Sequence, residues 1–316
     1  MRHRLLDALH GYSRYYQRQD EELKRLKGLY SKVSKKQRTQ LEQLVHYSDQ
    51  FAQIEKLVKS NQILCDRIVG NALEFYEIDR SELDKHVQNL EANGRKADKV
   101  AVSQSLKHIV RDWTEAGGPY ERFQVTINEW SMYMNVAYRF LEAHAHQPGS
   151  ESIYPFVDSW SHHATKADMH RRLSFPDVAL NASEVLLVEG DFTTVFDAKP
   201  RPQYDVIITY FFIDTARNLA GYFDTIEALL RTGGYWINLG PLLYGTAPFI
   251  QLPLEDIVTV VEEGMGFKLL DIAGSECGEI TLPGKVVRGI EAAYGFNDRA
   301  LTRNAYNAQF WVAQRP

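Results

Sequence analysis

Two acidic residues directly follow predicted strands, where a nucleotide-binding sheet places its ligands. Glu129 comes after the strand predicted at 123–127, and its carboxylate could accept hydrogen bonds from both hydroxyls of a ribose. Asp191 comes after the strand predicted at 185–188 and precedes Phe192, so this segment offers an acceptor for an amine and an apolar surface for an adenine ring. Ordinary roles compete with these, because Glu129 also suits a helix start and Phe192 also suits a core.

A second pair of candidates follows the most apolar strand and the strand after it. Asp214 lies just beyond the strand predicted at 205–211, where a carboxylate could bind a substrate cation or accept a proton during nucleophilic attack. It could also cap the helix that follows. Tyr244 comes after the strand predicted at 235–239 and a Gly-Pro turn, which we expect to project its ring over the same side of the sheet.

Several other kinds of chemistry lack support. Five of the ten histidines fall between His144 and His170, but there is no His-Glu-x-x-His pattern, so we expect no metal. Cys65 and Cys277 are the only cysteines, which argues against a disulfide scaffold or a thiolate zinc site. The chain contains neither a Gly-x-Ser-x-Gly elbow nor a Gly-x-x-x-x-Gly-Lys loop, so serine hydrolase and nucleotide triphosphatase functions are not favoured.

The elements that must position these residues are of two kinds. Residues 5–113 contain no proline and repeat apolar residues every three or four positions, which predicts helices. Later residues alternate short apolar runs with helical patterns, which predicts an α/β fold with a mainly parallel sheet covered on both faces. We therefore predict a helical region at 1–117 and an α/β domain at 118–316.

Composition points to small-molecule chemistry. The 316 residues carry a net charge of −5, which gives no electrostatic drive toward nucleic acid or anionic membranes. The longest apolar stretch, Val206–Ile213, is too short for a membrane span, and the first ten residues do not form a secretory signal. We expect a cytoplasmic protein, with the nucleus as a further compartment, and a homodimer through the helical region as one arrangement.

Taken together, the strings around these candidates resemble the carnosine N-methyltransferase family. The resemblance implies transfer of a methyl group from S-adenosylmethionine to a histidine-containing dipeptide, on a Rossmann-like class I methyltransferase sheet preceded by a helical region. It runs nearly end to end and rests on these segments: residues 109–113 (IVRDW), 128–131 (NEWS), 154–155 (YP), 175–177 (FPD), 190–192 (GDF), 211–216 (FFIDTA) and 236–244.

The resemblance also implies roles for single residues. Arg111 would contact the methionine carboxylate, with His108 beside it in the cofactor site. Glu129 would bind the ribose, and Asp191 with Phe192 the adenine. Asp214 would hold the substrate imidazole and act as the catalytic residue, with Tyr244 and Tyr306 as further substrate contacts.

The chain departs from the family in three places. Only 14 residues separate Trp113 from Asn128, where the family has its first strand, a glycine-rich cofactor loop and a helix. His108 replaces a family glutamine, and Gly245 replaces a substrate-binding histidine. Three interpretations remain: a carnosine-type methyltransferase, an impaired or incompletely represented member, and a methyltransferase redirected to another imidazole or amine.

Overall fold

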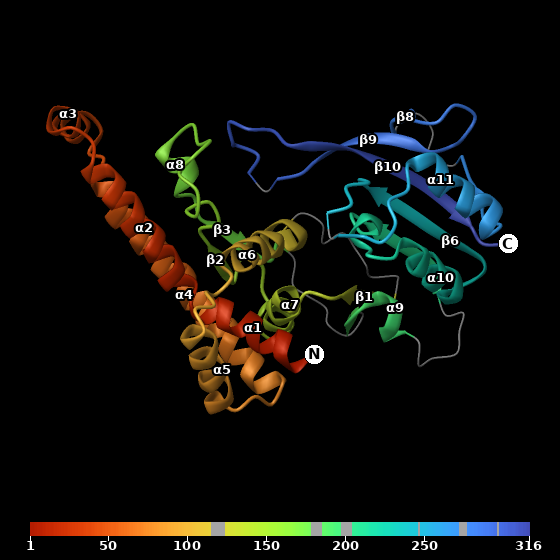
Figure 1. The fold of residues 1–316 in the computed structure, drawn as a ribbon, viewed down its shortest axis with the longest axis horizontal. Helices are drawn as coiled ribbons and strands as arrows, with labels where there is room; N and C mark the ends of the chain where they lie inside the picture. The colour runs from red at the N-terminus through yellow and green to blue at the C-terminus, as the bar shows by residue number, and fades with distance from the viewer. Residues whose placement is uncertain (115–123, 178–184, 197–203, 246, 272–276, 296) are drawn as a thin grey trace. The chain divides into compact units, whose positions relative to one another are not determined.

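The computed structural model divides into two compact units (Figure 1). One contains Met1–Gly190 with Phe296–Leu301, and the other contains Asp191–Gly295 with Thr302–Pro316. The structure describes all residues except 115–123, 178–184, 197–203, 246, 272–276 and 296. For residues 110–114 it describes the backbone but not the side chains. The predicted boundary at 117 falls among the residues outside this description and stays a prediction.

The first unit is mainly helical, as the apolar spacing predicts. Its longest helix, α4, buries Ile54, Leu57, Asn61, Leu64 and Ile68 at three- and four-residue intervals, which places them on one face of the helix. This face packs with α1, α2 and α7 around the core of the unit. The helices are α1 (Arg2–Ser13), α2 (Tyr15–Ser31), α3 (Lys35–Val45), α4 (Asp49–Phe75), α5 (Arg80–Ala92), α6 (Lys99–Thr114), α7 (Met132–His144) and α8 (Lys166–Met169).

Two small sheets complete this unit. β1 (Val125–Glu129) pairs in parallel with β4 (Val185–Glu189), so that Glu129 and Glu189 lie side by side at the carboxyl ends of the two strands. β2 (Glu151–Ile153) and β3 (Leu173–Phe175) form an antiparallel pair. The parallel pair places the candidate residue Glu129 at a strand end, as predicted from the sequence.

The second unit holds a six-stranded sheet in the order β5-β6-β10-β9-β8, with β7 also paired to β10. Only β5 and β6 are parallel in this sheet, so the prediction of a mainly parallel sheet is wrong here. β10 returns beside β9 without a crossover helix, and such a connection produces an antiparallel pair. The strands are β5 (Tyr204–Tyr210), β6 (Leu230–Gly240), β7 (Lys268–Leu269), β8 (Glu279–Ile280), β9 (Arg288–Ala293) and β10 (Ala305–Gln314).

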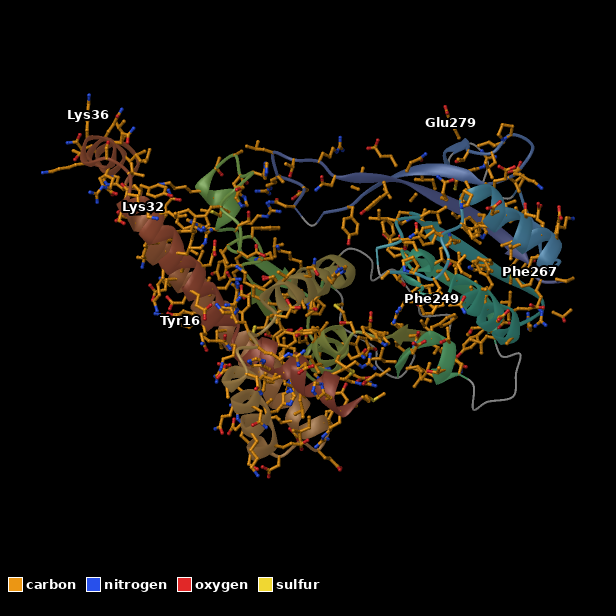
Figure 2. The ribbon with its side chains drawn as sticks, in the orientation of Figure 1. Tyr16, Lys32, Lys36, Phe249, Phe267 and Glu279 are labelled. Atoms are coloured by element: carbon orange, nitrogen blue, oxygen red, sulfur yellow. The ribbon has the colours of Figure 1, made fainter. Side chains whose placement is uncertain are left out.

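One face of this sheet is covered and carries the core of the unit. Trp236 and Trp311 pack on it edge to face at 5.5 Å, and the core also includes Phe267, which Figure 2 labels. The covering elements are α9 (Phe192–Val195), the 3₁₀ helix η1 (Ile213–Thr215), α10 (Leu219–Leu229), α11 (Leu254–Thr259) and the π-helical turn η2 (Val260–Gly264). Among the described residues, no helix is long and apolar enough to cross a membrane.

The opposite face of β5 is exposed. Val206, Ile208 and Tyr210 alternate along the strand and are 40%, 67% and 58% exposed. The prediction that both faces are covered is therefore wrong for this part of the sheet. The helices α10 and α11 bury the face that carries Trp236, which leaves the apolar side chains on the other side of β5 in contact with solvent.

Candidate functional site

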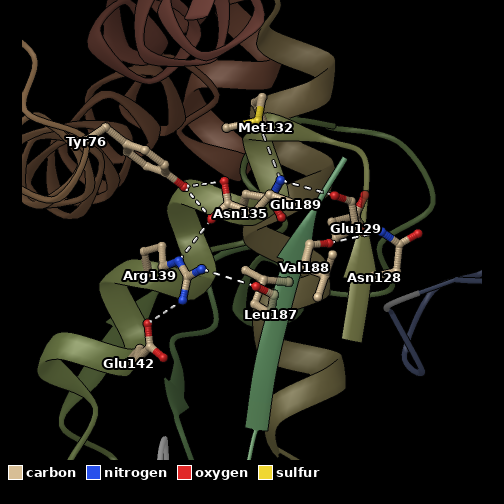
Figure 3. A network of polar contacts seen from close by, with 10 residues as sticks. All are labelled: Tyr76, Asn128, Glu129, Met132, Asn135, Arg139, Glu142, Leu187, Val188 and Glu189. Atoms are coloured by element: carbon tan, nitrogen blue, oxygen red, sulfur yellow. Dashed lines mark hydrogen bonds and ion pairs between the residues drawn. The ribbon is translucent and has the colours of Figure 1, made fainter. Parts of the chain in front are cut away.

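The carboxyl ends of β1 and β4 are joined by side-chain hydrogen bonds (Figure 3). Asn128 donates from Nδ2 to the carbonyl oxygens of Val188 at 3.0 Å and Gly190 at 3.1 Å. The neighbouring Glu129 accepts a hydrogen bond at Oε1 from the backbone N–H of Ser131 at 2.6 Å. These contacts hold the Glu129 carboxylate at the junction between β1 and α7.

The electrostatics of Glu129 bring a second predicted residue into this site. Burial raises the pKa of Glu129, whereas the N–H groups of Ser131 and Trp130 and the charge of His108 act in the opposite direction. His108 on α6 therefore lies close enough to interact with Glu129. The family resemblance implies only that His108 belongs to the cofactor site. Arg111 lies on the same helix, and its side chain is outside the described residues.

A neighbouring network was not predicted. Tyr76 donates from its hydroxyl to both carboxylate oxygens of Glu189, at 2.8 and 2.9 Å, and Arg139 donates from Nε to the same carboxylate at 3.0 Å (Figure 3). The side chain of Glu189 is only 8% exposed, so its charge is buried with these partners. The network satisfies Glu189 internally and leaves Glu129 as the strand-end carboxylate suited to a ligand.

Phe192 adopts the core role that competed with nucleotide binding, and Asp191 caps a short helix, a role that was not predicted for it from the sequence. Gly190, at φ 148°, turns the chain out of β4. Asp191 then caps α9 by accepting hydrogen bonds at Oδ1 from the N–H and the hydroxyl of Thr193, at 2.9 and 2.7 Å. Phe192 is 9% exposed and packs edge to face with Phe212 at 5.3 Å. The adenine role of both residues stays a prediction.

Asp214 lies in η1, directly after β5, and is 7% exposed. Its Oδ2 accepts a hydrogen bond from the backbone N–H of Leu243 at 3.0 Å. Burial raises the pKa of Asp214, and the N–H groups of Leu243 and of Asp214 itself oppose that rise. The N-cap of the next helix, α10, is Asn218, so the interpretation of Asp214 as a helix cap is wrong.

Tyr244 follows Leu243, whose N–H binds Asp214, so it lies near that carboxylate at the end of the neighbouring strand. Burial raises the pKa of Tyr244, and the negative charge of Asp214 contributes to the rise. The Tyr244 hydroxyl donates to the carbonyl oxygen of Leu252 at 2.7 Å, which fixes the ring while leaving its oxygen able to accept. A buried carboxylate and a phenol thus lie in the same region, where β5 and β6 end, an arrangement that can bind an N–H group and accept its proton.

Tyr306 and Gly245 complete the predicted substrate positions. Tyr306 lies in β10, half-buried, with its ring 6.0 Å from Phe211 and 5.2 Å from Tyr294. Phe211 immediately follows β5, so these rings form an aromatic cluster near the end of that strand. A Cβ atom added to Gly245 would meet its nearest neighbour, the Leu243 carbonyl oxygen, at 3.8 Å, so there is space for a side chain.

The described residues fit a nucleoside better than a complete S-adenosylmethionine. Glu129 offers the carboxylate that ribose hydroxyls require at the end of a strand. No described strand leads through a glycine-rich loop into a long helix; β4 leads through Gly190 into α9, which has only four residues. The backbone cradle for the charged methionyl end is therefore missing from the described part of the chain.

Comparisons with known proteins identify the family. The family model described as "Carnosine N-methyltransferase" matches residues 119–316. A "Carnosine N-methyltransferase" of Schizosaccharomyces pombe is 26% identical over 330 residues, covering 84% of this chain and 82% of the relative. The Mus musculus protein of that name is 28% identical over 316 residues, covering 83% and 74%. "Carnosine N-methyltransferase unmet" of Drosophila melanogaster is 28% identical over 198 residues, covering 60% and 40%.

The alignments also bear on the length of the chain. The alignment with the Schizosaccharomyces pombe relative spans 330 positions, more than the 316 residues of this chain, so the relative has residues at positions where this chain has none. The family model nevertheless matches more than half of the chain. On this match, the chain belongs to the carnosine N-methyltransferase family, whose named relatives are methyltransferases.

Proposed function

We propose that this protein is an S-adenosylmethionine-dependent N-methyltransferase that acts on the imidazole of carnosine or a related histidine-containing small molecule. The observation that carries the proposal is the buried carboxylate of Asp214 beside Tyr244, at the ends of β5 and β6. Family membership supplies the reaction class, and this pair supplies a group that can hold an imidazole N–H.

Asp214 would do most of the chemistry assigned to the protein. When bound, S-adenosylmethionine would supply the methyl group from its sulfonium, which would become a neutral thioether with the electron pair of the broken C–S bond. The Asp214 carboxylate accepts a hydrogen bond from the N–H of one imidazole nitrogen. The lone pair of the other nitrogen is then free for in-line attack on the methyl carbon. The proton of that N–H passes to the carboxylate as the ring becomes cationic. A raised pKa favours this transfer at neutral pH.

The cofactor residues are proposed on the same basis. Glu129, next to His108, would accept the ribose hydroxyls, and Arg111 would pair with the methionine carboxylate. Asp191 and Phe192 would border the adenine, although in this structure Asp191 caps α9 and Phe192 lies in the core. The adenine amine would therefore have to donate to the Asp191 carboxylate alongside the bonds from Thr193 that cap α9, without replacing them.

A second candidate is a family member that is impaired as written. We infer that the residues present in the Schizosaccharomyces pombe relative and absent here include the strand, glycine-rich loop and helix that the family places before Asn128. The exposed apolar side chains on β5 support this, because such a face is normally covered. Gly245 supports a third candidate, a changed substrate, since the space beside it is open.

The experiment uses two proteins: the chain as written, and a restored chain in which the unmatched segment of the Schizosaccharomyces pombe relative is inserted between Tyr120 and Phe123. Methyl transfer from radiolabelled S-adenosylmethionine is measured with carnosine and with free histidine. We expect activity in the restored chain and its loss in Asp214→Ala, with cofactor binding kept. Unchanged turnover in Asp214→Ala would show that Asp214 has no part in the mechanism. A restored chain that binds the cofactor but methylates neither compound would show that neither carnosine nor histidine is the substrate.

A further inference from the structure

Three metal-ligating side chains meet on the first unit: His3, Asp7 and His86. His3 and Asp7 are one turn apart on α1, so they share a face of the helix. His86 comes from α5, which packs against α1 (Figure 1). The ligand atoms of the three residues all lie within 4.8 Å of one another.

The Asp7 carboxylate lies between the two imidazoles. Its Oδ2 is 3.1 Å from Nδ1 of His3, and its Oδ1 is 2.8 Å from Nε2 of His86. The two rings stand edge to face, with centroids 5.1 Å apart and planes at 85°. Three donor atoms on three separate side chains therefore converge on one small volume.

These distances are close to those of a metal site. Zinc binds imidazole nitrogen and carboxylate oxygen at about 2.0–2.1 Å, so neighbouring ligand atoms in a tetrahedral site lie about 3.3 Å apart. The 2.8 Å contact of His86 is to Oδ1 of Asp7 and the 3.1 Å contact of His3 is to Oδ2. With one ligand atom from each residue the spacings stay within 4.8 Å, and rotation of the Asp7 carboxylate and the exposed His3 ring can shorten the longer ones. Two imidazoles with one carboxylate form a donor set that first-row transition metals accept while keeping a position open for water.

The surroundings permit a cation. Arg2, which precedes His3 on α1, is neutralised by Glu82, to which it donates from Nε at 2.9 Å and from Nη2 at 2.5 Å. The side chain of His3 is 68% exposed, that of Asp7 35% and that of His86 13%. The site thus has an inner ligand held by α5 and an outer ligand in solvent, which gives an ion a path of entry.

We propose that His3, Asp7 and His86 form a binding site for one divalent transition-metal ion, with zinc as the best match, and that the ion links α1 to α5. Two of the ligands come from one helix and the third from another, so a bound ion would hold the two helices together. Binding to the folded chain alone would raise its melting temperature, by an amount that grows with the concentration of free ion.

The test uses the full chain without an affinity tag, freed of metal with a chelator and titrated with zinc chloride in a calorimeter. We expect one ion per chain with a dissociation constant in the micromolar range, a rise in melting temperature, and a tetrahedral absorption spectrum when cobalt(II) replaces zinc. Magnesium should not bind, because two of the three ligands are imidazoles.

Two variants and a matched control decide the outcome. His3→Ala removes an exposed side chain, and His86→Ala removes the inner ligand; each should weaken zinc binding at least tenfold. His146→Ala is the control, because His146 is also an exposed histidine of this unit, with its Nε2 2.8 Å from the Ala143 carbonyl oxygen. Equal zinc affinity in His3→Ala, His86→Ala and the unchanged chain, or no binding below millimolar zinc, would overturn the proposal.

Discussion

The backbone N–H of Leu243 donates a hydrogen bond to Oδ2 of Asp214 over 3.0 Å. This bond ties the segment after β6 to the segment after β5, and these strands are parallel neighbours. It stabilises the charged form of a carboxylate that burial disfavours. Asp214 is therefore held in place without an ion pair of its own in the described structure, a state that suits a group that must exchange a proton with a substrate.

The buried charge of Asp214 should consequently lower the free energy of unfolding at neutral pH. Its folded-state pKa lies above the unfolded value, so the cost of its charge is fully present above the folded pKa and disappears as the pH falls toward the unfolded value of about 4. We predict that Asp214→Asn raises the melting temperature of the second unit at pH 7–8, by about 2–4 °C for each 1 kcal/mol gained. The gain should vanish near pH 4.

The measurement is thermal unfolding across this pH range. Asp224→Asn serves as the control, because Asp224 is an exposed carboxylate on α10 of the same unit. It should change the melting temperature little at any pH. A lower melting temperature for Asp214→Asn at pH 7–8 would mean that the hydrogen bond from Leu243 outweighs the cost of burial.

The exposed face of β5 gives a test of the missing segment that does not depend on activity. Ile208 is 67% exposed here, so we predict that Ile208→Thr changes the free energy of unfolding by less than about 0.5 kcal/mol. In the restored chain this side chain should become buried, and the same substitution should cost about 1–3 kcal/mol.

Urea unfolding of both chains, with and without Ile208→Thr, measures these differences. Ile226→Thr is the control. Because Ile226 is fully buried on α10, this substitution should destabilise both chains by the same amount. An equal, small effect of Ile208→Thr in both chains would show that the inserted segment does not cover β5.

The sequence predicted the elements better than their pairing. Apolar spacing placed the helices of the first unit, and the strand ends that carry Glu129 and Asp214 lie where short apolar runs end. The antiparallel position of β10 was missed, because a strand's apolar pattern does not encode the direction of its neighbour.

Site contacts were predictable where the chain itself brings residues together. Asp214 and Tyr244 follow neighbouring strands, so their proximity follows from the order of the elements. The bond from Tyr76 to Glu189 spans 113 residues, and that from His86 to Asp7 spans 79. Contacts of that separation depend on how helices pack against the rest of the unit, and no local motif in this sequence signals them.

The affinity for S-adenosylmethionine should be low, because the described residues provide a group for its ribose but not for its methionyl end. Glu129 can hold the ribose, but no described glycine-rich loop follows a strand to hold the methionyl end. We predict that the chain as written binds S-adenosylmethionine with a dissociation constant weaker than about 0.1 mM in calorimetry, and that the restored chain binds it more tightly. A low micromolar constant for the chain as written, which corresponds to about −8 kcal/mol, would require a complete site.

Substrate choice should depend on position 245. A substrate polar group that loses its hydrogen-bond partner in a buried site costs about 1–3 kcal/mol, or about ten- to a hundredfold in specificity. An added Cβ at Gly245 would make only an ordinary contact, at 3.8 Å from the Leu243 carbonyl oxygen, so the backbone there accepts a side chain. We therefore predict that Gly245→His in the restored chain raises the rate of carnosine methylation at least tenfold.

The readout is the initial rate of methyl transfer to carnosine and to free histidine, compared between the glycine and histidine forms of the restored chain. Gly295→His is a matched control, because Gly295 is an exposed glycine of the same unit with no atom within 4 Å of an added Cβ. It should leave both rates unchanged. Equal carnosine methylation by the glycine and histidine forms would make position 245 irrelevant to recognition. If neither form methylates carnosine but another imidazole or amine is methylated, the third interpretation of the sequence, a redirected methyltransferase, takes the place of the first.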